Sequence, residues 1–540
     1  MLPPTLSTRL GFLLLALLLA GVGCGRRTRP VDEGIRTGTL LLGNSAEPAD
    51  LDPHLANSYT DLNLLNALFE GLTVLDERTS QALPGCAERW QTSPDGLTWT
   101  FHLRPGLTWS NGDPVTSEDF VFAYRRILTP VFGASYSYML WPIRGAEAFN
   151  RGQETDFGTV GIQAPDAQTL VITLHQPTPY LAALTSHATW FPLHRATIER
   201  FNGVTRQGTA WTRPGNLVGN GAFTLEDWQP NARLTVVRNP RYWNNANTGL
   251  ERIVFLPVES AEVEERNFRA GQMHITYAVP PSKIPTLQAE TPSPLRVDPL
   301  LNTWYLNYNV ARPPLNDPRV RRALALAIDR PALSQAVFHG ARAPAFSFTP
   351  PDCGGYTAKV RIERDVETAR RLLAEAGFPN GQGLPELPMQ VLNDSFLPRL
   401  AEALQAMWAR ELGVRITIEM YEQKTWLQNQ QSKSHTLGLL GWVADFADPV
   451  TFLDLFTTDN GNNWTNWSDA TYDQLLQQAS AEPDPLKRFD LFQRAEAYLL
   501  EQAPITPIVF GSRTYLLHPA VKNWEPAPLG FHRFQRIRLQ

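Results

Sequence analysis

The sequence predicts a large protein of the α/β class, and three observations support this prediction. The chain has 540 residues, of which 43% are hydrophobic and 19% are charged, so it is too apolar and too weakly charged for a disordered polypeptide. Segment 97–104 alternates apolar and polar residues with a period of two, which indicates a half-buried strand. From residue 317 onward, helical patterns lead directly into strand patterns, and this alternation is typical of layered α/β folds.

The first half of the chain carries mostly strand and turn signals. Segments 232–238 and 250–256 are predicted as further strands, and a polar loop joins them. The turn signal at 111–114 precedes a predicted helix over 117–124. Residues 219–221 lack the third glycine of a dinucleotide-binding fingerprint, so we interpret them as a tight turn before a strand.

The second half is predicted to be richer in helices. Asp317 is a good N-cap and Pro318 fits the first helical position, so a helix begins there. The arginines on this helix are expected to face water, and they are Arg319, Arg321 and Arg322. The spacing of apolar residues predicts further helices over 365–376, 400–412 and 484–499. An alternating strand is predicted over 414–420.

The N-terminus predicts export from the cytoplasm. Residues 10–23 are apolar throughout, and this run is shorter than the roughly 20 residues that span a bilayer but suits the core of a signal peptide. Cys24 follows Gly21 and Gly23, which resembles a bacterial lipoprotein signal, in which cleavage makes the cysteine the lipidated N-terminus. We predict a signal peptide over 1–23 and a lipid anchor at Cys24, with ordinary secretion and an incidental cysteine as the alternative.

Charge and motif content exclude several function classes. With 48 basic and 53 acidic residues, the net charge of −5 leaves no basic surplus to neutralise phosphates, so no nucleic-acid partner is expected. Three cysteines cannot build a disulfide scaffold, although Cys86 and Cys353 could pair in an oxidising compartment. The sequence has no zinc motif, Walker loop or nucleophile elbow. We therefore predict no cofactor, no metal site and no catalytic residues.

Eight short motifs, in order along nearly the whole mature chain, carry a resemblance to a known family. They are LDPH at 51–54, LFEGL at 68–72, WSNGDPVT at 109–116 followed by DFV at 119–121, NGAF at 220–223, NPRYW at 239–243, NDPRVR at 316–321, GWVADF at 441–446 followed by DP at 448–449, and FHRF at 531–534. In this order they resemble the extracytoplasmic oligopeptide-binding proteins of ABC importers, which are bacterial solute-binding proteins of family 5.

The resemblance implies a two-lobe periplasmic-binding-protein fold, type II-like, with an extra small domain on the first lobe. The implied boundaries are 24–69, 194–301 and 513–540 for the first lobe, 70–193 for the extra domain and 302–512 for the second lobe. The chain is expected to cross between the lobes near Leu301 and Ser512. The implied function is that of a monomeric, non-enzymatic carrier. It captures oligopeptides outside the cytoplasmic membrane and delivers them to the transmembrane subunits of an ABC permease.

The resemblance also implies where a peptide would bind. Asp445 would anchor the peptide ammonium group, and Trp442 would form a wall of the cleft. The segment 56–60 and the backbone before Asp445 would pair with the peptide as with an added strand. The ligand-binding residues implied in this way are Asp445, Trp442, Val443, Ala444, Phe446, Asn57, Ser58, Tyr59 and Arg312.

The site for the peptide carboxylate departs from the family pattern, and this leaves alternatives open. Gln430 and Leu439 stand where peptide-binding members carry basic residues, so Arg312 is the remaining basic candidate. Asp445 could instead cap a local turn, and Arg312 could be an ordinary loop residue. The solute could be a modified or cell-wall peptide, a sugar, a metal chelate or haem. A lipoprotein sensor or an envelope chaperone is a further alternative.

Overall fold

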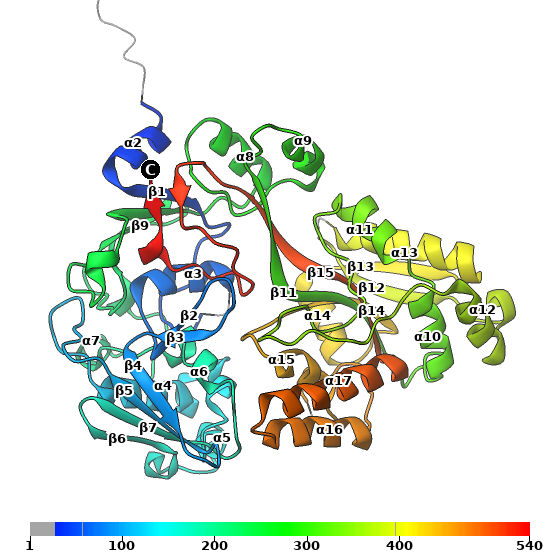
Figure 1. Cartoon of the computed structure of the whole chain (residues 1–540), viewed down its shortest axis with the longest axis horizontal. Coiled ribbons are helices and arrows are strands. Elements are labelled where there is room, and N and C mark those ends of the chain that lie inside the picture. Colours follow the sequence, from blue (N-terminus) through cyan, green and yellow to red (C-terminus); the bar gives the residue numbers. More distant parts are fainter. Residues whose placement is uncertain (1–27, 57, 395, 459) are drawn as a thin grey trace, which may run out of the picture.

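Two lobes of mixed α/β structure are joined by two long strands, along which the chain passes from one lobe to the other (Figure 1). The computed structural model describes residues 28–540 apart from 57, 395 and 459. The predicted signal peptide and the predicted lipidation site Cys24 lie outside the described residues, as does Asn57. Among the helices that the structure describes, none is both long and apolar enough to cross a lipid bilayer.

The first lobe contains a four-stranded sheet in the order β1–β10–β9–β8, in which only β1 and β10 are parallel. Its strands are β1 (Thr39–Gly43), β8 (Phe223–Gln229), β9 (Arg233–Arg238) and β10 (Arg252–Leu256). The helices next to these strands in the chain are α2 (Pro30–Thr37), α3 (Tyr59–Leu68), α7 (Arg195–Arg200), α8 (Ala261–Arg269) and α9 (Ile284–Gln288). The strands predicted at 232–238 and 250–256 are confirmed as β9 and β10. Short strands β16 (Val521–Lys522) and β17 (Arg538–Leu539) pair near the C-terminus.

A second four-stranded antiparallel sheet, in the order β4–β5–β7–β6, lies below the first lobe in Figure 1. Its strands are β4 (Ala87–Thr92), β5 (Thr98–Leu103), β6 (Ile162–Asp166) and β7 (Thr169–Thr173). The accompanying elements are β2 (Thr73–Leu75), β3 (Ala82–Pro84), α4 (Ser117–Leu128), α5 (Ala146–Asn150) and α6 (Leu181–Leu184). The alternation predicted for β5 is confirmed, because Trp99, Phe101 and Leu103 are buried and the residues between them are half-exposed.

The second lobe contains a five-stranded mixed sheet in the order β13–β12–β14–β11–β15. Its strands are β11 (Leu295–Tyr308), β12 (Leu387–Leu392), β13 (Ile416–Tyr421), β14 (Leu437–Val443) and β15 (Ile505–Leu516). Its helices are α10 (Pro318–Leu326), α11 (Arg330–Phe338), α12 (Val366–Glu375), α13 (Leu397–Leu412), α14 (Gln423–Gln431), α15 (Val450–Leu453), α16 (Ala470–Ala481) and α17 (Pro485–Gln502). The helices predicted in this half of the chain are thereby confirmed.

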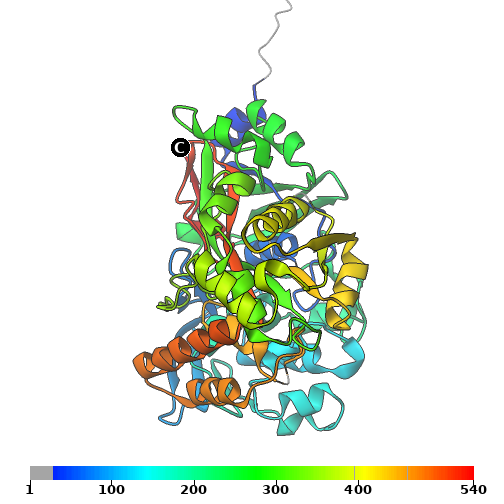
Figure 2. The ribbon, with the colours of Figure 1, turned by 90° about the vertical axis from the view of Figure 1, so that its right-hand side faces the viewer.

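Strands β11 and β15 form the connection between the lobes. They pair over 295–299 with 512–516 and again over 303–307 with 505–510, with an irregular break between the two ladders. Figure 2 shows them running side by side, in green and red. Leu301 lies inside the break and Ser512 at its edge, so both predicted crossing points fall where the ladder is interrupted. The exact domain boundaries stay predictions.

Two details of the sequence-based picture change in the structure. Arg321 does not face water: it is 3% exposed and donates hydrogen bonds to the carbonyl oxygens of Leu315, Gln502 and Ala503. The end of α17 leaves carbonyl groups without helical partners, and the buried guanidinium satisfies two of them. Cys86 and Cys353 are both free, buried thiols that pack in different hydrophobic clusters, so they form no disulfide.

Candidate functional site

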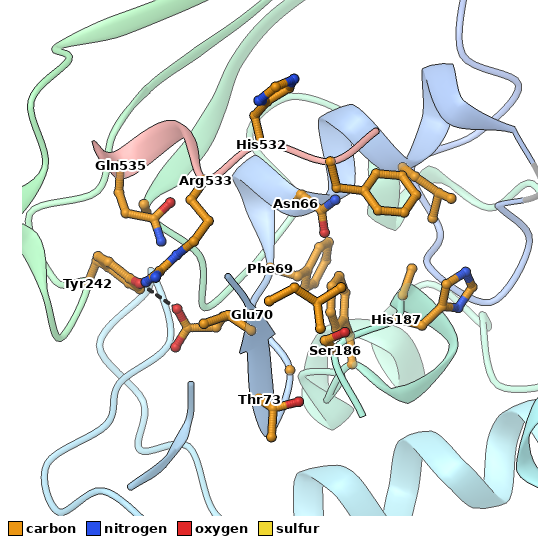
Figure 3. Close-up of a pocket in the computed structure, with 18 of the residues that line it drawn as sticks. Asn66, Phe69, Glu70, Thr73, Ser186, His187, Tyr242, His532, Arg533 and Gln535 are labelled. Atoms are coloured by element: carbon orange, nitrogen blue, oxygen red, sulfur yellow. Dashed lines mark hydrogen bonds between the residues drawn. The ribbon is translucent and has the colours of Figure 1, made fainter. Parts of the chain in front are cut away.

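Three adjoining hollows form a cleft where the two lobes face each other. The central hollow holds about 1090 Å³ of empty space, and its lining includes Ser58, Tyr59, Tyr136, Tyr138, Trp442 and Asp445. The side hollow holds about 740 Å³, and its lining includes Asn66, Glu70, His187, Tyr242, Asp445 and Arg533 (Figure 3). The hinge hollow holds about 650 Å³, and its lining includes Tyr59, Asn63, Tyr277, Ser512, Arg513 and Gly530. Asp445 borders the first two hollows, and Tyr59 borders the first and third.

The Asp445 carboxylate is a desolvated anion with no counter-charge. Among the described residues, no side chain forms a hydrogen bond or an ion pair with it. Burial raises the pKa of this carboxyl from its ordinary value of 3.8 to about 6. His187 supplies no positive charge at neutral pH, because burial lowers the pKa of its imidazole to about 4. The carboxylate therefore leaves a place in the cleft that a cationic group of a ligand can fill.

Strand β14 offers an unused backbone edge beside this carboxylate. On one side β14 pairs with β11 along its whole length, but on the other side β12 pairs only with Leu437 and Gly438. The Ala444 N–H donates to the Leu301 carbonyl, so by alternation the N–H and C=O groups of Gly441 and Val443 point away from β11. An extended chain could bind to this edge through main-chain hydrogen bonds.

The opposite wall of the central hollow comes from the start of α3. Ser58 is the N-cap of this helix, because its hydroxyl accepts a hydrogen bond from the Asp61 N–H. The Tyr59 ring packs against Phe531 with ring centroids 5.4 Å apart. Trp442 faces them from the second lobe, and its indole N–H is buried without a hydrogen-bond partner among the described residues. Aromatic rings thus line the central hollow from both lobes, and the Trp442 indole N–H is available to a ligand as a hydrogen-bond donor.

Comparisons with known proteins identify the family of this chain. The family model for bacterial extracellular solute-binding proteins, family 5 (middle), matches residues 81–464. The periplasmic oligopeptide-binding protein OppA of Salmonella typhimurium is 33% identical, and the match covers 90% of this chain and 89% of OppA. The chain belongs to family 5 of the bacterial extracellular solute-binding proteins.

Two further members extend this comparison. The probable deoxycholate-binding periplasmic protein YgiS of Escherichia coli is 35% identical, over 88% of this chain and 89% of YgiS. The unliganded open form of the periplasmic murein tripeptide-binding protein MppA superposes with a TM-score of 0.81 at 32% identity, covering 93% of this chain and 97% of MppA. Family membership and this superposition confirm the resemblance and the two-lobe fold class. Family 5 proteins bind solutes and are not enzymes, so this chain is a binding protein.

Most of the implied ligand-binding residues of this family 5 protein meet in the central hollow. Asp445, Trp442, Val443, Ala444, Ser58 and Tyr59 all line it. Phe446 does not line any of the three hollows. Its ring instead stacks on Tyr180 of the extra domain, with centroids 4.5 Å apart and planes inclined by 9°. Phe446 therefore forms a contact between the two halves of the protein.

The residues considered for binding the carboxylate end of a peptide lie outside the three hollows. Gln430 and Leu439 are buried within the second lobe. Arg312 is exposed and donates to the Thr436 hydroxyl at the start of β14, whereas Asp445 follows its end. Seven residues of strand span roughly 20 Å, so Arg312 lies far from the Asp445 carboxylate and lines none of the hollows. Arg312 stays a prediction without support from the geometry of the cleft.

Sequence reasoning did not select several residues that line the cleft. Tyr136 and Tyr138 come from the extra domain, Tyr277 follows the first-lobe sheet, and Arg513 lies on β15. None belongs to a motif of the family, and only the proximity of Arg513 to the predicted crossing at Ser512 could have drawn attention to it. In the described part of the chain, no group of three or more His, Cys, Asp or Glu residues is arranged to hold a metal ion.

Proposed function

We propose that this protein is the solute-binding component of an ABC importer that captures oligopeptides outside the cytoplasmic membrane. Asp445 would bind the amino terminus of the peptide. The carrying observation is the desolvated carboxylate without a counter-charge, which lies at the end of an unused strand edge. OppA and MppA, whose names describe peptide ligands, are among the similar proteins and support this choice of solute.

The geometry supports binding that does not depend on peptide sequence. The ammonium group would neutralise Asp445, and the first backbone amides would pair with Gly441 and Val443. Side chains would then occupy the three hollows, which together have room for varied groups. Removing one partner of a buried charge pair typically weakens binding by about 2–5 kcal/mol. A micromolar ligand has about 8.2 kcal/mol in total, so the ammonium contact would be a large share of the affinity.

Binding would favour closure, because the peptide would touch both lobes. Ser58 and Tyr59 belong to the first lobe, and Trp442 and Asp445 belong to the second. A ligand shifts an equilibrium between open and closed forms only through contacts that the closed form makes better. The closed form would deliver the peptide to the transmembrane permease subunits. The protein would act as a monomer tethered to the membrane by a lipid on Cys24, with no cofactor.

Calorimetric titration of the ligand-free mature protein tests this function. A mixture of tripeptides to pentapeptides is compared with the same mixture after N-acetylation, which removes the ammonium group and little else. We expect binding of the free amines only, and loss of that binding in Asp445→Asn. The control variant is Glu402→Gln, which removes a carboxylate from an exposed position of α13. Equal binding of acetylated and free peptides would contradict the proposal.

A bile-acid-like solute is the second candidate. YgiS is named as a probable deoxycholate-binding protein, and four tyrosines line the central hollow, where flat rings could pack on a steroid. The Asp445 carboxylate opposes this candidate, because it would repel the carboxylate of deoxycholate. Titration with deoxycholate in place of the peptides distinguishes the two. Binding of deoxycholate without binding of peptides would favour the second candidate.

A further inference from the structure

Arg513 is a cation at the hinge hollow, and in the described part of the chain no carboxylate is in direct contact with it. Arg513 lies on β15, one position after Ser512, and it borders the hinge hollow. Within the residues that the structure describes, the one hydrogen-bond contact of its guanidinium is from Nη1 to the Nε2 atom of His532 at 3.4 Å, and its Nε is buried without a partner. Among the described residues, no carboxylate oxygen lies within 4.0 Å of its guanidinium nitrogens.

Asp298 and Glu264 are two acidic residues near Arg513, and each accepts hydrogen bonds from other groups. Asp298 stands opposite Arg513 in the β11–β15 ladder, but its carboxylate accepts a hydrogen bond from the Tyr515 hydroxyl at 2.5 Å. Glu264 accepts hydrogen bonds from the N–H groups of Tyr277 and Ala278 at 2.9 and 3.0 Å. Burial raises the pKa of Glu264 to about 7, so this carboxyl is about half protonated at neutral pH. Neither residue neutralises Arg513 by direct contact.

Aromatic rings hold the guanidinium in place at the edge of the hollow. It lies 5.3 Å from the ring centroids of both Tyr277 and Tyr515, and 6.0 Å from that of Trp524. Contacts of this kind stabilise a cation electrostatically but leave its N–H donors free. Arginine presents those donors as a planar fork that matches a carboxylate. The side chain is therefore positioned for an anion that the structure does not supply.

Arg513 and Asp445 flank the same tyrosine. Tyr59 borders both the central and the hinge hollow. The pKa of its hydroxyl is raised by burial and by the negative charge of Asp445, and it is lowered by the positive charge of Arg513. Tyr59 thus lies between two hollows that carry charges of opposite sign, Asp445 in the central one and Arg513 in the hinge one. A zwitterionic ligand that passes over this ring would meet both.

Arg533 is a second arginine of the cleft whose Nε is buried without a hydrogen-bond partner among the described residues, but it borders a different hollow. Arg533 borders the side hollow, and Figure 3 shows its side chain directed toward Glu70 and Tyr242. Glu70 is buried, and its charge and that of Arg533 influence each other. Arg533 therefore borders a hollow that also contains acidic residues, whereas the described residues that line the hinge hollow with Arg513 include no acidic side chain.

We propose that Arg513 determines specificity by binding a carboxylate of the ligand in the hinge hollow while Asp445 binds the ligand ammonium group. This proposal rests on the proposed function and makes the preferred solutes short, zwitterionic peptides or peptide-like compounds. The carboxylate is either an acidic side chain near the amino terminus or the carboxyl terminus of a short ligand. Both sources present the same chemistry to the guanidinium, and the experiment separates them.

Calorimetric titration with defined tripeptides tests the proposal. Trialanine amide is the neutral reference. Trialanine adds the terminal carboxylate, and the amides of Glu-Ala-Ala and Ala-Glu-Ala add a side-chain carboxylate at one position each, with glutamine isosteres as matched references. We expect at least one of these carboxylates to raise the affinity of the wild-type protein tenfold or more. Arg513→Gln should abolish that gain and leave the affinity for trialanine amide within about twofold, and Arg513→Lys should keep part of the gain.

The control variant is Arg296→Gln, which removes an exposed arginine from the neighbouring strand β11 outside the three hollows. It should keep the full carboxylate gain. An unchanged thermal midpoint and unchanged binding of trialanine amide show that Arg513→Gln has folded. If no carboxylate raises the affinity, or if the gain survives in Arg513→Gln, the assignment of Arg513 is wrong. N-acetyl-trialanine amide separates this failure from a failure of the proposed function. The proposed function predicts that acetylation abolishes binding whether or not Arg513 binds a carboxylate, so binding of the acetylated amide would contradict the proposed function itself.

Discussion

The loop that follows β14 carries two carboxylates, Asp445 and Asp448, in opposite environments. Asp448 accepts two hydrogen bonds from the Arg488 guanidinium, at 2.6 and 2.8 Å, and a third from the Val450 N–H. Asp445 borders the cleft and has no such partner in the described part of the chain. Burial disfavours the charged form of both, but only Asp448 is compensated within the protein.

The first lobe and the hinge show the same contrast with the charges exchanged. Arg126 is fully buried and forms two hydrogen bonds with Asp52, at 2.6 and 3.0 Å. Arg513 borders a hollow and has no carboxylate within ion-pair distance among the described residues. The ion pairs Asp448–Arg488 and Asp52–Arg126 belong to the packed interior of the lobes, whereas Asp445 and Arg513 border the cleft. The contrast indicates which charges hold the fold together and which are available to a ligand.

Breaking the Asp448–Arg488 pair should give the largest effect on stability. Asp448→Asn leaves a buried guanidinium without its counter-charge, and changes of this kind typically lower the free energy of unfolding by about 3–5 kcal/mol. Urea denaturation followed by circular dichroism measures the change. The double variant Asp448→Asn with Arg488→Met should recover part of the loss, and a single variant as stable as the wild type would show that the pair is not structural.

Asp445→Asn should affect binding and not folding. The free energy of unfolding should stay the same or rise, because the variant removes a desolvated charge that has no partner. The affinity for free-amine peptides should fall roughly 30-fold or more, which corresponds to the lower end of the 2–5 kcal/mol range for a buried charge contact. Denaturation and calorimetry on the same preparation test both halves. If Asp445→Asn lost as much stability as Asp448→Asn, Asp445 would be a structural carboxylate like Asp448 and not one kept for a ligand.

The raised pKa of Asp445 predicts how peptide binding depends on pH. The carboxyl of the empty cleft is half protonated near pH 6, and only its charged form attracts an ammonium group. Affinity should therefore be highest near pH 7, where the carboxylate is charged and the peptide α-amino group, with an ordinary pKa of about 7.7–8.0, is still mostly protonated. It should fall toward tenfold per pH unit below about pH 5. Because folding raises this pKa, the same group makes the empty protein less stable as the pH rises from about 4 to 6. Titrations between pH 4.5 and 8 should show this dependence in the wild type and a flat profile in Asp445→Asn.

The smallest effect is expected at the contact between Tyr180 and Phe446. Stacked aromatic pairs are worth about 0.5–1.5 kcal/mol beyond the area that they bury. Tyr180→Ala should therefore shift the ligand-free protein toward more open arrangements and weaken peptide binding less than tenfold. Small-angle X-ray scattering with and without peptide measures the opening. A radius of gyration identical to that of the wild type would show that this contact does not influence closure.

Local structure was largely predictable because it depends on nearby residues. The alternation in β5 and the Asp317 cap of α10 follow from patterns a few residues long, and both are present. Arg321 illustrates where such reasoning ends. Its helical position gives no sign of burial, which comes from the end of α17 about 180 residues further along the chain.

The family motifs show the same limit on a larger scale. Asn220 donates a hydrogen bond to the Glu70 carbonyl at 2.8 Å, and the Tyr242 hydroxyl donates to the Glu70 carboxylate, so three motifs meet in one buried cluster. Asp52 and His54 of another motif pair with Arg126, and burial lowers the pKa of His54 to about 3. Several motifs that identify the family thus build the interior of the first lobe, and two of their residues, Glu70 and Tyr242, also line the side hollow of the cleft.

Sequence alone establishes the α/β class, because this depends on periodicity, and the ordered motifs establish the family resemblance and make Asp445 the candidate ligand anchor. Tertiary packing decides the electrostatic state of each charge. Arg488 reaches Asp448 from 40 residues away, and no side chain in the part of the chain that the structure describes reaches Asp445 in this way, although both stand in the same short motif. Likewise, Arg513 belongs to no motif, and only the meeting of β15 with the first lobe places it in the cleft. The charge of a side chain is a property of its residue type, but its compensation depends on which distant segments fold against it.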